Sequence, residues 1–111
     1  MYLFMYFATV SAYYYYYSLA DTRFSVCAVF KYPTPTAKIF PHDVYLLKDK
    51  FHYKTCTIVG GELLANVTQG AGKGFYYMLR KPEYYYFACG IGNGTHCESG
   101  LMKFTVKVVK H

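Results

Sequence analysis

The chain has few acidic residues, no tryptophan, and none of the short motifs that mark common enzyme sites. Its 111 residues include six Asp and Glu in total, scattered along the chain. No serine lies in a nucleophile elbow. The glycine-rich segment 70–74 is not a phosphate-binding loop, because its lysine is followed by glycine rather than by serine or threonine. We therefore predict that the protein is not an enzyme.

Long amphipathic stripes of the kind that build helical bundles are also missing, and aromatic residues are abundant instead. The composition is 54% hydrophobic and 22% aromatic, with fifteen Tyr. Aromatic and β-branched residues favour strands, and short segments rich in them are separated here by turn residues. The expected strands are 24–32, 42–47, 63–68, 75–79, 84–89 and 102–109. With a strand from the N-terminal tyrosines, about seven short strands predict one all-β sandwich domain.

Charged side chains are absent from residues 1–20. One interpretation is a degenerate signal segment, because small residues at Ser18 and Ala20 suit signal-peptide cleavage. The other is an extra β-strand, formed by Tyr13–Tyr17 and retained in the mature protein. The segment is short for a transmembrane helix once the tyrosines are discounted. In both interpretations the main domain is expected over residues 21–111.

Basic residues outnumber acidic ones, and the formal net charge is +6. No run of Lys and Arg is dense enough to predict nucleic-acid binding. The positive charge either serves solubility or favours an anionic partner, such as an acidic cell-wall polysaccharide or a membrane surface.

The cysteines and two glycosylation patterns indicate in which cellular compartment the protein acts. The four cysteines allow three full disulfide pairings, which the sequence alone does not distinguish. Asn66 and Asn93 each begin an Asn-X-Thr acceptor pattern for glycosylation. Together these features predict a secreted or cell-surface protein.

Several soft metal ligands lie close together near the C-terminus. Cys89, His96 and Cys97 fall between two expected strands, and Met102 follows them. Thiolate, imidazole and thioether groups are the ligands that copper prefers. The segment is therefore a candidate copper site.

Three motifs resemble those of a known family. Segment 85–90 reads YYFACG, segment 96–103 reads HCESGLMK, and segment 42–44 reads HDV. These motifs are similar to those of the phytocyanins, the plant blue-copper proteins of the cupredoxin fold. The resemblance covers about residues 20–110. It implies a cupredoxin-like Greek-key β-sandwich with one type 1 copper ion, held by His42, Cys89 and His96.

The same resemblance has two further implications. It pairs Cys56 with Cys97 in a disulfide beside the copper loop, which leaves Cys27 without a partner. It also implies a weak axial ligand, and the position after Gly100, where the family has Met or Gln, is occupied by Leu101.

Strand parity favours Met102 over Leu101 as that axial ligand. Side chains alternate between the two faces of a strand. Met102 shares its parity with the apolar positions 104, 106 and 108, whereas Leu101 shares its parity with the lysines at 103 and 107. We therefore predict that Met102 faces inward; if Leu101 faces the metal instead, a three-coordinate site with a higher reduction potential is expected.

The function implied by the resemblance is one-electron transfer outside the cytosol. The protein would be a monomer that exchanges electrons with a redox partner which the sequence does not identify. The alternative is a copper-free structural or recognition module at the cell surface, of the early nodulin-like type.

Overall fold

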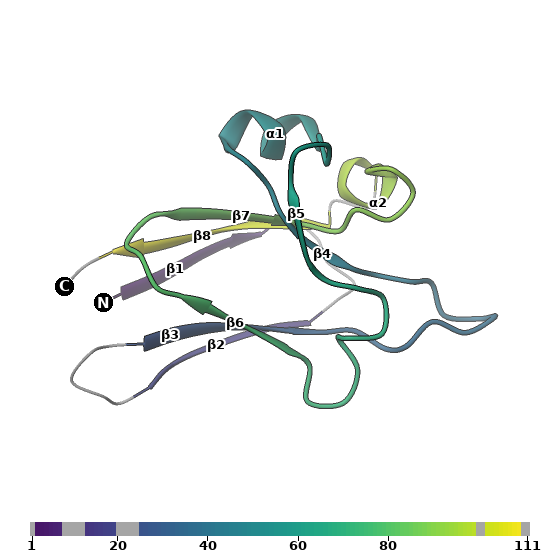
Figure 1. The fold of residues 1–111 in the computed structure, drawn as a ribbon, viewed down its shortest axis with the longest axis horizontal. Helices are drawn as coiled ribbons and strands as arrows, with labels where there is room; N and C mark the ends of the chain where they lie inside the picture. The colour runs from purple at the N-terminus through teal and green to yellow at the C-terminus, as the bar shows by residue number, and fades with distance from the viewer. Residues whose placement is uncertain (1, 8–12, 20–24, 100–101, 110–111) are drawn as a thin grey trace.

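The computed structural model describes residues 2–7, 13–19, 25–99 and 102–109, which form eight strands and two short helices (Figure 1). All strand pairs are antiparallel. A five-stranded sheet has the order β1 (Tyr2–Phe7), β8 (Lys103–Val109), β7 (Tyr84–Ala88), β4 (Val44–Leu46) and β5 (Glu62–Ala65). A three-stranded sheet has the order β2 (Tyr13–Leu19), β3 (Ser25–Lys31) and β6 (Phe75–Leu79). The prediction of a mostly β protein is confirmed.

Several strands are shorter than the sequence predicts. The strand expected over 42–47 is β4, and it begins only at Val44. The strand expected over 63–68 is β5, which ends at Ala65 because Asn66 starts a turn; the backbone N–H of Gln69 donates to the Asn66 carbonyl at 3.2 Å. Residues before Cys56 form a helix, α1 (Lys50–Thr55).

Two strands lie within the N-terminal 20 residues. β1 pairs with β8, and β2 pairs with β3 over its full length from Tyr13 to Leu19. Both are edge strands of their sheets. Their backbones therefore extend each sheet by one strand; whether the segment also serves as a leader stays a prediction.

The main core lies between the two sheets. Phe30 of β3 contacts Phe87 of β7 and Phe104 of β8, with ring centroids 5.0 and 5.6 Å apart. All three side chains are essentially fully buried. These contacts join the two sheets, which lie one above the other in Figure 1.

A second, smaller apolar cluster lies on the outer face of the five-stranded sheet, where α1 and α2 (Thr95–Glu98) pack. It contains the buried Leu47, Cys56, Ala88 and Cys97. The two helices are too short to be stable alone, so their position depends on this packing. Among the described residues, no helix has the length and apolar character needed to cross a membrane.

Asp49 caps α1 and makes its stability sensitive to acid. Its Oδ1 accepts the backbone N–H of His52 at 2.9 Å and lies 2.6 Å from the His52 ring Nδ1. These contacts, the side-chain hydrogen bond first, hold the pKa of Asp49 below its ordinary value. Because the folded pKa lies below the unfolded one, Asp49 stabilises the fold above about pH 4 and ceases to do so as the pH falls through the folded pKa.

We therefore expect Asp49→Ala to lower the denaturant midpoint near neutral pH and to have little effect in acid. Denaturant titrations of wild type and variant at a series of pH values from about 7 to about 3 measure this convergence. A difference that stays constant across the series would contradict the assigned role.

Candidate metal centre

The structure brings His42, Cys89 and His96 together. The Cys89 Sγ atom lies 4.0 Å from His42 Nδ1 and 3.6 Å from His96 Nδ1. The ligand atoms of all three residues lie within 4.8 Å of one another. His42 and Cys89 are buried, and His96 is partly buried. These three residues form a cluster that could hold a metal ion.

Strand pairing explains why residues so far apart in the chain meet. His42 lies just before β4, and Cys89 lies directly after β7. Because β4 and β7 are antiparallel neighbours, with Tyr45 opposite Ala88, the start of one strand lies beside the end of the other. His96 reaches the same place from α2, which follows the loop 90–94.

Backbone hydrogen bonds hold the three segments in register. The N–H of Cys89 donates to the Met102 carbonyl at 2.9 Å, and the N–H of Met102 donates to the His96 carbonyl at 3.0 Å. The N–H of Gly90 donates to Asp43 Oδ1 at 2.6 Å. The residue after His42 is therefore hydrogen-bonded to the residue after Cys89. Met102 connects Cys89 with His96, because its carbonyl accepts from one and its N–H donates to the other.

Burial favours the uncharged forms of Cys89 and His42 in the absence of a cation. Desolvation raises the pKa of the Cys89 thiol to about 11, although backbone N–H groups of Asp43 and Ile91 act in the opposite direction. Desolvation, followed by the nearby His96, lowers the pKa of His42. A neutral imidazole can donate its lone pair to a metal, and a metal ion would supply the positive charge that a thiolate needs here.

The geometry fits a trigonal metal ion. With bonds of about 2.0 Å to imidazole and about 2.3 Å to thiolate, ligands at 120° around one ion have nitrogen and sulfur about 3.7 Å apart. The two distances from Cys89 Sγ, 3.6 and 4.0 Å, bracket this value. Both imidazoles also present the same ring atom, Nδ1, to the sulfur. The distances from sulfur to the two nitrogens are therefore close to those of a trigonal site, whereas the imidazole nitrogens, within 4.8 Å of each other, would be about 3.5 Å apart around one ion.

Met102 lies beside this cluster. Its side chain is 4% exposed and belongs to the main core, so the predicted inward orientation is confirmed. Met102 and Cys89 line one small cavity, together with Phe87 and Phe104. Axial ligation by Met102 stays a prediction, and the alternative residue Leu101 lies outside the described part of the chain.

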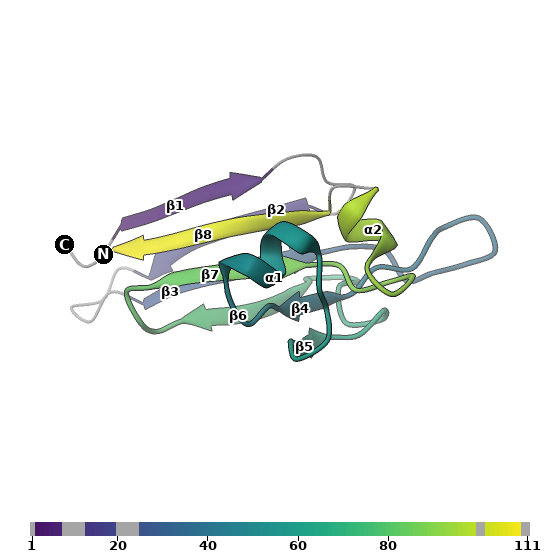
Figure 2. The same ribbon diagram turned by 90° about the horizontal axis from the view of Figure 1, so that it is seen from above.

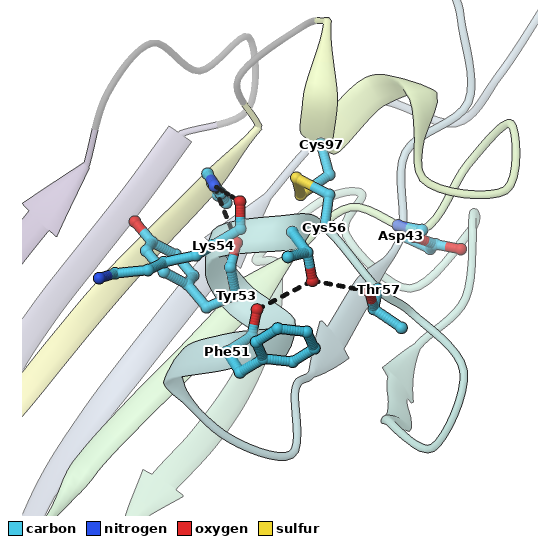
Figure 3. Close-up of a disulfide and its surroundings, with 10 residues drawn as sticks. Asp43, Phe51, Tyr53, Lys54, Cys56, Thr57 and Cys97 are labelled. Atoms are coloured by element: carbon cyan, nitrogen blue, oxygen red, sulfur yellow. Dashed lines mark hydrogen bonds between the residues drawn. A yellow bond between two sulfur atoms is a disulfide. The ribbon is translucent and has the colours of Figure 1, made fainter.

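The disulfide implied by the family resemblance is present. Cys56 follows α1 and Cys97 lies in α2, with their Cα atoms 5.7 Å apart (Figure 3). Because Cys97 is adjacent to His96, the bond ties the His96 segment to α1. Cys27 is a free and buried thiol in β3.

Sequence reasoning missed the side chains that support the candidate ligands. Tyr32 is buried edge-on to His42, with ring centroids 6.4 Å apart, and its hydroxyl donates to the Asn66 carbonyl at 2.7 Å. Its ring lies so close to Gly70 that a Cβ there would come within 2.4 Å of it. Asp43 belongs to the HDV motif, but the motif does not predict its hydrogen bond with the Gly90 N–H. Such contacts join segments far apart in the chain, so no local pattern predicts them.

The two glycosylation candidates lie at the surface. The side chains of Asn66 and Asn93 are exposed, and Thr68 Oγ1 donates to Asn66 Oδ1 at 2.9 Å. Glycosylation at either position remains a prediction.

Comparisons with protein-family models, curated proteins and solved structures give no match for this chain. Fold and site therefore define the protein at a general level, as a mostly β protein with a His–Cys–His cluster that could bind a metal.

Proposed function

We propose that the protein is a cupredoxin-type electron-transfer protein related to the phytocyanins, with His42, Cys89 and His96 as the ligands of one type 1 copper ion. The observation that carries this proposal is the approach of two imidazole Nδ1 atoms to the Cys89 sulfur, at 4.0 and 3.6 Å, in a largely buried site. Met102 is the proposed weak axial ligand.

The donor set favours copper on chemical grounds. One thiolate and two imidazoles with a distant thioether suit both Cu(I) and Cu(II), whereas carboxylate-rich sites suit harder ions. When bound, copper would supply one-electron exchange. The protein would hold the imidazoles and the thiol in nearly constant positions, because the hydrogen bonds of Met102 and Asp43 connect all three ligand segments.

The order of the strands supports a Greek-key sandwich. β4 and β5 form an antiparallel pair, β6 lies in the opposite sheet, and β7 returns to lie beside β4. A strand that returns beside the first strand of its group is the defining feature of this connection.

The disulfide supports the proposed location outside the cytosol. Structural disulfides persist mainly in oxidising compartments. Together with the exposed Asn66 and Asn93, the Cys56–Cys97 bond is consistent with a secreted or cell-surface protein, which we propose acts as a monomer on a separate redox partner.

Titration of the disulfide-intact protein with Cu(II) tests the proposed function. We expect an intense visible charge-transfer band that saturates at one equivalent, because a thiolate bound to Cu(II) absorbs strongly. The band should be absent in Cys89→Ser. Cys27→Ser is the matched control, since Cys27 is the other free and buried thiol, and it should keep the band.

A further variant examines the axial position. Met102→Leu should keep the band and raise the reduction potential, because a weak axial donor that favours Cu(II) is removed. An unchanged potential would contradict the role of Met102.

A colourless protein that binds zinc but no copper would contradict the copper proposal. A colourless protein that binds neither metal would favour the copper-free recognition module.

A further inference from the structure

A row of tyrosine and lysine side chains lies on the outer face of the five-stranded sheet. The rings of Tyr84 and Tyr86 are stacked, with centroids 6.1 Å apart and an interplanar angle of 8°. Tyr53 of α1 continues the row, 5.4 Å from Tyr86. Lys107 lies over the Tyr84 ring at 5.4 Å, and Lys103 lies over the Tyr53 ring at 4.6 Å. We call these five residues the tyrosine–lysine row.

The alternation of β7 and β8 produces this row. Tyr85 and Phe87 point into the core, so Tyr84 and Tyr86 point outward. In the antiparallel pairing of the two strands, Tyr84 lies directly opposite Lys107. Directly paired residues lie on the same face, which places the lysine next to the ring.

The two ends of the row differ in accessibility. At one end, Lys103 Nζ donates to the carbonyls of Tyr53 and Lys54, at 2.8 and 3.4 Å, so this lysine holds the last turn of α1. At the other end, Tyr84 is 51% exposed. Viewed from above, α1 covers the middle of the sheet. The start of β7 and the adjacent end of β8 are left uncovered (Figure 2). The open end, with Tyr84 and Lys107, is therefore the accessible part.

Positive charge predominates around this face. α1 lies over the same face and carries the exposed Lys50 and Lys54. Two carboxylates lie nearby: Glu83 directly precedes Tyr84, and Asp49 is already engaged by His52. The chain as a whole has a net charge of +6. The face therefore combines flat aromatic surface with an excess of cations.

We propose that this face binds an acidic polysaccharide, with a sugar ring packed on the exposed Tyr84 and uronate carboxylates paired with Lys107 and the lysines of α1. Exposed aromatic rings offer broad apolar surface to a pyranose ring, and ammonium groups form charge-assisted hydrogen bonds with carboxylates. Lys107 beside the exposed Tyr84 offers charge and apolar surface together, which suits a polymer that carries both carboxylates and sugar rings. The proposal does not depend on the copper site.

Binding of polygalacturonate by the disulfide-intact protein, measured by calorimetry, tests this proposal. Tyr84→Ala should weaken binding roughly three- to tenfold, the effect of losing one aromatic stacking contact. Tyr84→Phe should bind as wild type does. The matched control is Tyr76→Ala, since Tyr76 is 48% exposed but lies on β6 of the other sheet; it should leave the affinity unchanged.

Salt dependence provides a second measurement. Lys107→Gln should reduce the fall in affinity with increasing salt, because one ion pair with the polymer is lost. Lys73→Gln, in the exposed turn before β6, should leave the salt dependence unchanged.

Equal losses of affinity in Tyr84→Ala and Tyr76→Ala would overturn the proposal. So would equal binding of the fully methyl-esterified polymer, or tighter binding of single-stranded DNA or of anionic phospholipid vesicles.

Discussion

Replacing both Cys56 and Cys97 by alanine is expected to lower the free energy of unfolding by about 4 kcal/mol. The two residues are 41 positions apart, so the disulfide closes a long loop and removes much conformational freedom from the unfolded chain. The loss is large compared with the total stability of a typical domain of this size, which is about 5–15 kcal/mol. Guanidinium titrations of the oxidised wild type and the double variant measure it.

The same variant should weaken metal binding. Cys97 is adjacent to His96, and without the disulfide the His96 segment is held mainly by the hydrogen bond from the Met102 N–H to the His96 carbonyl. We expect the double variant to bind Cu(II) more weakly than wild type. Cys27→Ala is the control, because it removes a buried sulfur without opening a crosslink. Equal unfolding midpoints for the double variant and wild type would contradict the assigned role of the disulfide.

Phe87→Ala is expected to destabilise the protein by about 3–5 kcal/mol, the usual cost of deleting a buried aromatic ring. Phe87 is 1% exposed and contacts Phe30 of the opposite sheet and Phe104 of the neighbouring strand β8, with ring centroids 5.0 and 5.1 Å away. Because Phe87 also lines the cavity beside Cys89 and Met102, the new void would lie next to the candidate metal centre. Denaturant unfolding measures the loss.

Phe51→Ala provides the matched control for this prediction. Phe51 has the same side chain but is 67% exposed on α1. Its replacement should change the free energy of unfolding by less than about 0.5 kcal/mol. If the two variants were destabilised equally, the core would not be centred on Phe87.

Strand-favouring residues bounded by turn residues made the strands of the C-terminal half predictable. The expected strand 75–79 coincides with β6, and the expected 84–89 is one residue longer than β7. The inward orientation of Met102 followed from the alternation within the last strand alone, because a strand with one buried face imposes a period of two on its sequence.

The N-terminal tyrosines show where this reasoning stops. Tyr13–Tyr17 are identical residues, so they have no alternation and fit a leader segment as well as a strand. Their pairing partner, β3, is adjacent in sequence, but β1 pairs with β8 at the other end of the chain. The residue pattern within one strand contains no information on which distant strand it pairs with.

The sequence by itself determined the class of the fold and the chemistry available to the site. Strand-favouring residues with period-two alternation specify a β protein, and the soft donors Cys89 and His96 lie close together in one loop. Only the tertiary structure brought His42 to within 4.0 Å of the Cys89 sulfur and placed Asp43 and Tyr32 around them. The reason is physical: local propensity acts over a few residues, whereas the centre is assembled by the pairing of β4 with β7 and by a disulfide between residues 41 positions apart.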